Sequence, residues 1–257
     1  MSGQSPLIAR EVEAHYLETR ESERLSGVHG ELERLRTLEI LARVLPPAPA
    51  VIFDIGGAAG AYAFPLSERG YVVHLIDPVE LHLKQAKARS ESSGIKLGSI
   101  TKGDARFLSA PSNSADAVLL LGPLYHLVER ADRMMALREV RRILKSQGVL
   151  IAAAISRFAS LIDGLARGFF RDAEFRKIVA NDLATGQHSN PTDQTAYFTT
   201  AYFHRAEELA DEVYEASLAD IQILAGEGPV WSTAHLGEAW YDPVQRKTLM
   251  EFLSLVE

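Results

Sequence analysis

The sequence predicts an α/β protein with a doubly wound, mostly parallel sheet. Short apolar runs of strand length alternate with amphipathic helical stretches between residues 51 and 155. The first run enters a glycine-rich turn, and the second leads to an acidic residue, Asp77. Strands that alternate with helices at this spacing pair in parallel through right-handed crossovers, which places helices on both faces of the sheet.

The composition narrows the class of protein. With 257 residues, of which 47% are apolar and 24% charged, the chain suits one large globular domain. Its formal net charge of −7 disfavours nucleic acid as a partner. The absence of cysteine excludes disulfides and cysteine nucleophiles, and the dispersed histidines predict no metal site. Without a signal-like N-terminus or an apolar run of membrane length, we expect a cytoplasmic protein that does not enter membranes.

Helices are expected before the sheet. Leucines recur at three- and four-residue spacings between residues 7 and 45, with Glu and Arg between them. Gly27 and Gly30 divide this stretch into two helices, and the prolines at 46, 47 and 49 end the second one.

The sheet region follows in regular order. We expect strands at Val51–Ile55, Tyr71–Ile76, 97–101, Ala117–Leu121 and Val149–Ile155. The helices between them cover 61–69, Leu81–Ser93 and Arg130–Leu144, and Ser146-Gln147-Gly148 forms a turn. The Arg and Asp residues within 130–142 are interpreted as a solvated helix face.

After residue 155 the alternation breaks. Residues 157–182 predict one helix with an unusually aromatic face, whose phenylalanines pack onto the core or line an apolar pocket. A polar stretch at 184–200 precedes a helix at 205–216, a strand near 218–225, and helices at 235–240 and 243–256. We expect one domain with an N-terminal helical cover (1–46), a cofactor-binding core (47–156), a helical lid (157–203) and a C-terminal part of the core (204–257).

The turn Asp54-Ile-Gly56-Gly57-Ala-Ala-Gly60 indicates an adenosine-containing cofactor. A strand, a glycine turn, a helix and a second strand ending in an acid hold such cofactors at the carboxyl edge of a parallel sheet. The dinucleotide pattern G-x-G-x-x-G fails, because Ala58 and Ala61, or Ala59 and Tyr62, occupy the later glycine positions. No Gly-Lys-Ser/Thr follows the glycines, so a P-loop is also absent.

The same turn resembles motif I, D-x-G-x-G-x-G, of the class I S-adenosylmethionine-dependent methyltransferases, with Ala58 in place of the usual glycine. The resemblance covers about residues 30–156. Each motif alone is weak evidence for the family, whereas five motifs in the expected order are specific evidence. The other four are Asp77, Gly103-Asp104-Ala105, Asp116–Leu121 with Gly122-Pro-Leu-Tyr-His126, and Arg141–Gly148. The resemblance implies a Rossmann-like methyltransferase sheet of seven strands, or of six if no final strand lies within Gly228–Thr233.

The resemblance also implies the cofactor, S-adenosyl-L-methionine, which becomes S-adenosyl-L-homocysteine. Asp77 would accept the ribose hydroxyls and Asp104 the adenine amine. The other implied cofactor-binding residues are Asp54, Gly56, Gly57, Ala58, Gly60, Pro78, Ala105, Leu121 and Gly122. Each of these acids also has a structural interpretation that remains open. In that interpretation Asp54 braces the turn, Asp77 caps a helix, and Asp104 is a turn residue. Glu33 and Arg36 either reach the methionine end or, as we favour, form a solvated helix face.

The catalytic candidates are Tyr125 and His126, which follow the fourth strand, where the resemblance places the transferred methyl group. A histidine there is suited to act as general base toward a hydroxyl or an amine, and a structural role in the loop is the equal alternative. His188, Tyr197, Tyr202 and His204 are weaker candidates to face a substrate.

The implied activity is that of an enzyme, an S-adenosylmethionine-dependent methyltransferase, acting by in-line displacement on an oxygen or nitrogen of a small-molecule acceptor. Gly122-Pro-Leu-Tyr125 lacks the Asn/Asp-Pro-Pro-Tyr of enzymes that methylate planar nitrogens, and cytosine methylation would need a cysteine. Two alternatives stay open: a non-catalytic cofactor-binding or regulatory protein, and a nicotinamide-dependent oxidoreductase. The sequence carries no signature of an oligomeric state.

Overall fold

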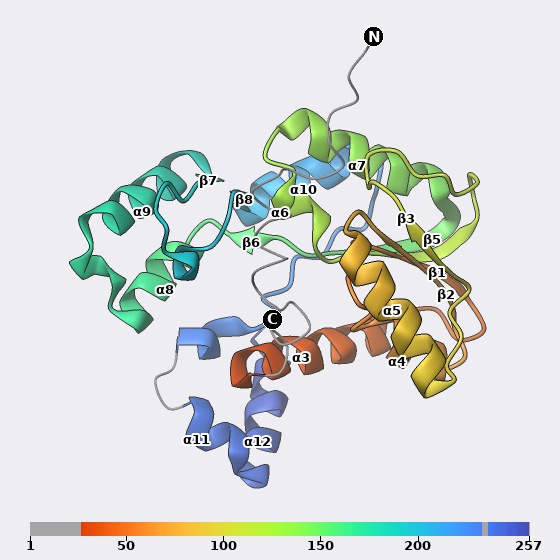
Figure 1. The fold of residues 1–257 in the computed structure, drawn as a ribbon, viewed down its shortest axis with the longest axis horizontal. Coiled ribbons are helices and arrows are strands. Elements are labelled where there is room, and N and C mark those ends of the chain that lie inside the picture. Colours follow the sequence, from red (N-terminus) through yellow and green to blue (C-terminus); the bar gives the residue numbers. More distant parts are fainter. Residues whose placement is uncertain (1–26, 233–235, 257) are drawn as a thin grey trace.

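The computed structural model describes residues 27–232 and 236–256, so the first predicted helix lies outside the described residues. Its central sheet has five strands, all parallel, in the order β3-β2-β1-β4-β5 (Figure 1). The strands are β1 (Val51–Ile55), β2 (Val72–Asp77), β3 (Ser99–Lys102), β4 (Ala115–Leu120) and β5 (Leu144–Ala152). Parallel pairing is confirmed, and the sheet has fewer strands than the six or seven expected.

Successive strand residues face two different cores, as the two-residue period of a strand requires. Ile52, Leu75 and Leu119 pack with α3 (Val28–Val44), α4 (Ala63–Glu68) and α5 (Glu80–Ser93) on one face. Phe53, Ile76 and Val118 pack with α7 (Arg130–Ile143) and α10 (Ala206–Glu215) on the other. The doubly wound architecture is therefore confirmed.

The strand order reverses at β1, which pairs with β2 on one side and β4 on the other. In open α/β sheets the crevice outside the carboxyl ends of the strands at such a reversal is the usual ligand site. The turn after β1 and the short helix α6 (Pro123–His126), which follows β4, both lie at this edge. The predicted turn at Ser146–Gly148 is wrong, because these residues belong to β5, whose register with β4 shifts there.

Residues 157–203 extend away from the sheet as a helical insert (Figure 1). The predicted single helix is two helices, because Gly168, with φ of +72°, ends the first one. A small sheet of order β6-β8-β7 joins the insert to the core, and its strand β8 was not predicted. The elements are β6 (Ile155–Ser156), α8 (Ala159–Arg167), η1 (Phe169–Arg171), α9 (Ala173–Thr185), β7 (Gln187–His188), η2 (Thr195–Tyr197) and β8 (Ala201–His204).

The aromatic residues of the insert form a core of their own. Phe175 lies 5.2 Å from Phe169 and 4.7 Å from Tyr197, measured between ring centroids, and Phe170 packs on the same cluster. The expectation that these phenylalanines pack onto the main core was wrong, since they stabilise the insert itself. Phe158, by contrast, is exposed.

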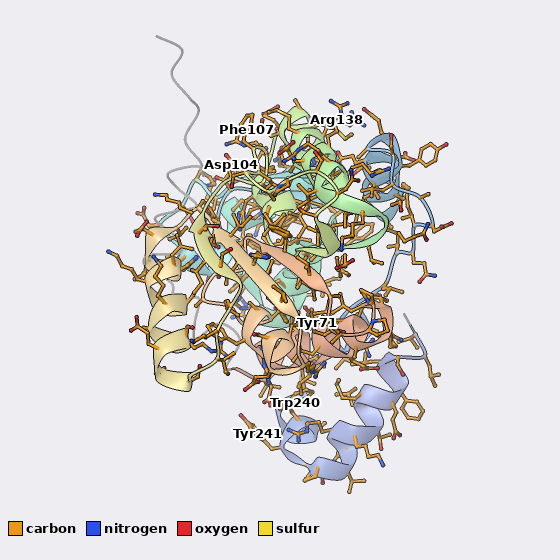
Figure 2. All side chains as sticks on the ribbon, turned by 90° about the vertical axis from the view of Figure 1, so that its right-hand side faces the viewer. Tyr71, Asp104, Phe107, Arg138, Trp240 and Tyr241 are labelled. Atoms are coloured by element: carbon orange, nitrogen blue, oxygen red, sulfur yellow. The ribbon has the colours of Figure 1, made fainter. Side chains whose placement is uncertain are left out.

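The C-terminal part differs from the prediction. Residues 218–225 form no strand, and Gly228–Ser232 is the 3₁₀ helix η3 rather than a final strand. Helices α11 (Leu236–Tyr241) and α12 (Pro243–Leu253) pack on α3 through a cluster that includes Leu32 and Trp240. In Figure 2 Trp240 and Tyr241 lie at the end of the molecule opposite Asp104 and Phe107. Across the described ranges, every helix is too short or too polar to cross a bilayer.

Candidate functional site

A cavity of about 1520 Å³ opens at the carboxyl ends of the central strands. Its volume exceeds the ~300–1,000 Å³ typical for one drug-sized ligand, so it has room for a cofactor and a second molecule. Helix α3, helix α6, the end of β8 and residues 222–229 complete its wall. The predicted site residues that line it are Asp54, Gly56, Gly57, Ala58, Asp77, Pro78, Asp104, Ala105, Leu121, Gly122, Tyr125 and His126.

The glycine turn is shaped by close contacts with its neighbours. The N–H of Gly56 donates to the carbonyl of Ile76 at 2.7 Å, which ties the turn to the end of β2. Gly56 has φ of +72°, and a Cβ on it would lie 2.7 Å from Cγ of Pro123. Ala58 also has a positive φ, +46°, so the turn accepts its methyl group at a small conformational cost. Gly56 therefore lets the two predicted motifs, motif I and the α6 segment, lie against each other.

Asp54 is a buried carboxylic acid with an unsatisfied oxygen. Its side chain lies directly beneath Gly57, where an added Cβ would come within 2.6 Å of Oδ2. Asp54 is only 2% exposed, and its Oδ2 has no hydrogen-bond partner within the described residues. Burial, and then the charge of Asp77, raise the pKa of Asp54 to about 7. Such a group costs free energy unless a ligand satisfies it.

Asp77 ties three segments together at the end of β2. Its Oδ2 accepts a hydrogen bond from the N–H of Ala58 at 2.9 Å. Its Oδ1 accepts from the N–H of Val79 at 2.9 Å and faces Nδ1 of His82 at 3.0 Å. Val79 is the residue before α5, so the carboxylate supports the start of that helix as well as the turn. His82, which also lines the cavity, was not foreseen.

Asp104 is clamped by an arginine that the sequence analysis did not single out. Arg106 donates from Nη2 to Oδ2 of Asp104 at 2.7 Å and from Nε to both carboxylate oxygens at 3.1 Å. The same guanidinium donates from Nη1 to Asp132 at 2.8 Å. Hydrogen bonding to Asp104 is the main cause of the raised pKa of Arg106. The spacing of Arg106, two residues after Asp104, was the sequence signal that could have predicted this ion pair.

Gly60 is the one predicted cofactor-binding residue that does not line the cavity. It has φ of +81°, and an added Cβ would lie 2.7 Å from the Phe64 ring. Its carbonyl accepts a hydrogen bond from Arg89 at 3.3 Å. In this structure Gly60 allows the turn to pack on α4.

Arg36 contradicts the solvated interpretation of its helix face. Its side chain is 1% exposed and lines the cavity together with that of Glu33. The guanidinium donates from Nε to the carbonyl of Gly226 at 3.1 Å and from Nη1 to Glu39 at 2.6 Å. A buried guanidinium thus faces the same cavity as the unsatisfied carboxyl of Asp54.

Tyr125 and His126 form an aromatic wall of the cavity. Their ring centroids lie 4.6 Å apart, and the ring of Phe198 from the insert stacks on His126 at 6.3 Å. Phe198 has φ of +69°, an uncommon conformation for a bulky residue. Of the weaker candidates, His204 lines the cavity, whereas His188 and Tyr197 lie inside the insert and Tyr202 packs under Arg133.

Comparison with known proteins finds a similarity in the part of the chain that forms the central sheet. Residues 53–152 match the family model described as "Methyltransferase domain". No curated protein matches the chain. The matched segment runs from β1 to β5 and carries all five predicted motifs, so this part of the chain is similar to a methyltransferase domain.

Solved structures share the fold at low sequence identity. A protein of Thermotoga maritima described as a possible histamine N-methyltransferase is 22% identical, with 80% of this chain and 81% of that one covered and a TM-score of 0.54. A methyltransferase of Methanosarcina mazei is 20% identical, with 69% and 82% covered and a TM-score of 0.55. The [4+2]-cyclase SpnF is 19% identical, with 72% and 57% covered and a TM-score of 0.50. At these identities the likeness extends to the fold alone, which hosts more than one reaction.

Proposed function

We propose that the cavity binds S-adenosyl-L-methionine along the glycine turn and that the protein transfers its methyl group to an oxygen or nitrogen of a small-molecule acceptor. The observation that carries this proposal is Asp54, a buried carboxyl with an unsatisfied oxygen at the floor of the cavity. A cationic ligand beside it would supply the missing partner, and the methionine portion of this cofactor carries an ammonium and a sulfonium group.

The lining residues suit the other parts of the cofactor. Arg36 offers a guanidinium for the methionine carboxylate. Oδ2 of Asp77 accepts only one described hydrogen bond, so the carboxylate retains capacity for a ribose hydroxyl. Asp104 and Ala105 would face the adenine, with the side chain of Asp104 oriented by Arg106. Gly56, Gly57, Ala58, Pro78, Leu121 and Gly122 would supply the close backbone and apolar contacts.

The bound cofactor would supply an electrophilic methyl group that needs no further activation. The protein's work is then to hold the acceptor in line with that methyl group and to exclude water. Tyr125, His126 and Phe198 form the wall suited to this task, with Phe198 contributed by the insert. We propose that residues 157–203 act as the cover of the acceptor site.

The charge of the cavity bears on the acceptor. Among the described lining residues, carboxylates outnumber guanidinium groups. An acidic cavity favours neutral or cationic acceptors over anionic ones, because anions are repelled at close range. We therefore propose an amine or a hydroxyl compound without net negative charge as the acceptor, and neither nucleic acid nor membrane as a partner.

The cofactor assignment is tested by calorimetric titration with S-adenosylhomocysteine, with NAD as the competing ligand. We expect binding of the former only. Gly57→Ala should abolish it, because the new methyl group displaces the Asp54 carboxyl. Gly226→Ala is the matched control, since its Cβ meets nothing within 4 Å although the residue also lines the cavity. Binding of NAD alone would overturn the assignment.

The acceptor class is tested by methyl transfer from labelled S-adenosylmethionine to a panel of amines, phenols and carboxylates. Histamine belongs in the panel because one structural relative is described as a possible histamine N-methyltransferase. Transfer to amines or phenols is expected, and transfer confined to carboxylates would contradict the charge argument.

A further inference from the structure

His204 lies at the end of β8, on the wall of the cavity. Strand β8 packs against α6, the helix that presents Tyr125 and His126, so His204 lies beside the segment where the methyl group is expected. The side chain is 3% exposed. A histidine that is both buried and cavity-lining needs an account of each ring nitrogen.

The first ring nitrogen is held by a carboxylate. Nε2 of His204 lies 3.3 Å from Oε2 of Glu212 on α10. Arg133 in turn donates to Glu212 from Nη2 at 2.7 Å and from Nε at 3.0 Å. Burial alone would raise the pKa of Glu212, but the hydrogen bonds from His204 and Arg133 outweigh it and lower this pKa to about 2. Because an ionised carboxylate only accepts, Nε2 must carry a hydrogen.

The second ring nitrogen is unused. Nδ1 of His204 is buried and has no hydrogen-bond partner within the described part of the chain. With the hydrogen on Nε2, the neutral ring keeps a lone pair at Nδ1. A buried acceptor without a donor is unfavourable, so this arrangement lowers the stability of the folded chain.

The same arginine connects His204 to the predicted catalytic segment. Arg133 is 1% exposed, against our interpretation of its helix face as solvated. Its Nη1 donates to the carbonyls of Leu127 at 2.9 Å and Val128 at 2.6 Å, directly after α6. One guanidinium therefore holds both Glu212 and the chain that follows His126 in place.

We propose that His204, positioned by Glu212, is the general base that removes the proton of the acceptor. This role rests on the proposed methyl transfer to oxygen or nitrogen. The O–H or N–H proton of the acceptor passes to Nδ1; the electron pair of the acceptor atom forms the new bond to carbon, and the carbon–sulfur pair remains on sulfur. His126 then serves as part of the aromatic wall, between Tyr125 and Phe198.

The first test reads the protonation of the ring without an acceptor. Two-dimensional ¹H–¹⁵N spectra of the imidazoles in the full chain, loaded with S-adenosylhomocysteine, are assigned with His204→Gln and compared with Glu212→Gln. We expect a single Nε2–H tautomer for His204 near pH 7, and a mixture of both tautomers in Glu212→Gln. An Nδ1–H tautomer, or a ring doubly protonated from pH 6 to 8.5, would overturn the proposal.

The second test uses the amine and phenol panel. His204→Gln should lower kcat by about 100-fold or more and remove the acidic limb of the pH–rate profile, with unchanged affinity for S-adenosylhomocysteine. The other charged or ionisable groups near His204 are Tyr202, whose ring lies 4.7 Å away between centroids, and Glu208, which interacts with it by charge. The backbone N–H of Arg157 donates to the carbonyl of His204, and Arg205 follows His204 in the chain. His74→Gln, on β2 and outside the cavity lining, is the matched control with unchanged kcat.

The outcomes separate the two proposals. If His126→Gln lowers kcat and His204→Gln leaves it unchanged, His204 is not the general base. This outcome would leave the methyltransferase proposal intact. Absence of transfer to every member of the panel would instead remove the proposed acceptor class, and the tautomer measurement would still decide whether His204 presents a lone pair.

Discussion

The histidine of the insert, His188, and the histidine of the cavity wall, His204, each face a buried carboxylate but differ in the contact of the second ring nitrogen. In the insert, His188 binds Asp182 through Nδ1 at 2.8 Å and the carbonyl of Tyr197 through Nε2 at 2.9 Å. On the cavity wall, His204 binds Glu212 through Nε2 and leaves Nδ1 without a described partner. Both histidines are almost fully buried.

The difference separates a structural pair from a functional one. A carbonyl oxygen can only accept, so His188 must carry a hydrogen on Nε2 and has no free lone pair to offer when Nδ1 donates to Asp182. Ser160 donates to the same Asp182 oxygen, which completes a network inside the aromatic core of the insert. His204 has the same kind of carboxylate partner, but its other nitrogen is buried without a described hydrogen-bond partner, and the residue lines the cavity.

The largest expected effect follows from removing the structural histidine. His188→Ala leaves the buried carboxylate of Asp182 with Ser160 as its one remaining donor among the described residues, which should lower the free energy of unfolding by about 3–5 kcal/mol. His204→Gln should cost about 1 kcal/mol, because Glu212 keeps Arg133. Urea denaturation at pH 7 measures both. Equal losses would show that the two pairs are not different in kind.

The buried carboxyl group of Asp54 has no described hydrogen bond from a histidine or an arginine. Its contribution to stability should therefore respond to pH in the opposite sense to that of Glu212. Its pKa is raised from 3.8 to about 7, so the folded state holds a proton that the unfolded state releases. That stabilisation is complete below pH 3.8 and is lost as the pH rises to about 7, a difference of ~4 kcal/mol at 1.36 kcal/mol per unit. In Asp54→Asn this decline should vanish. Urea denaturation of the ligand-free wild type and of Asp54→Asn between pH 4 and 8 measures this decline. The same dependence of the unfolding free energy on pH in both proteins would contradict the prediction.

Glu212→Gln should give a slightly smaller effect at acid pH. The pKa of Glu212 is lowered from 4.5 to about 2, so its contribution is present above pH 4.5 and lost as the pH falls toward 2. Linkage puts this contribution at ~3 kcal/mol. The variant should be less stable than the wild type at pH 7, where Arg133 loses its charged partner, and should approach it near pH 2. Thermal unfolding followed by circular dichroism across this pH range checks the prediction. A difference in stability between variant and wild type that stays constant with pH would mean that the Glu212 carboxylate is not ionised in the folded state.

The smallest effect is expected at Ala58, in the glycine turn and remote from both pairs. Ala58→Gly relieves a positive φ of +46° but adds freedom to the unfolded chain. These terms oppose each other, so the free energy of unfolding should change by less than ~1 kcal/mol. The variant thereby gives the baseline for the other measurements. A loss of several kcal/mol would mean that the Ala58 methyl group packs against the turn.

The sheet was predictable because its signals are local. The apolar run Val51–Ile55, the glycine turn and Asp77 lie within 27 consecutive residues, and each can be recognised without knowing a distant partner. The prediction of a strand near 218–225 was wrong, although this stretch is also mostly apolar. In the structure, Gln222, Leu224 and their neighbours line the cavity instead of pairing with β5.

The site was only partly predictable, because charge neutralisation acts across long distances in sequence. Arg133 has the pattern of a solvated helix residue until Glu212, 79 positions later, is placed beside it. Arg36 is likewise buried by Gly226, a partner that no helical period identifies. The unused nitrogen of His204 is a property of the assembled wall and has no counterpart in residue spacing.

The docking of α11 and α12 on α3 has a consequence for how the cavity comes into existence. Arg36 meets Gly226, 190 positions away, and Glu31 accepts a hydrogen bond from Trp240, 209 positions away. Contacts of such separation form late, after most of the loop-closure entropy has been lost. The chain can therefore complete its parallel sheet while the wall that carries Arg36 still awaits the segment around Gly226 and Trp240. Binding of a ligand in the cavity would then report that this long-range wall has formed, and not merely that the sheet has folded.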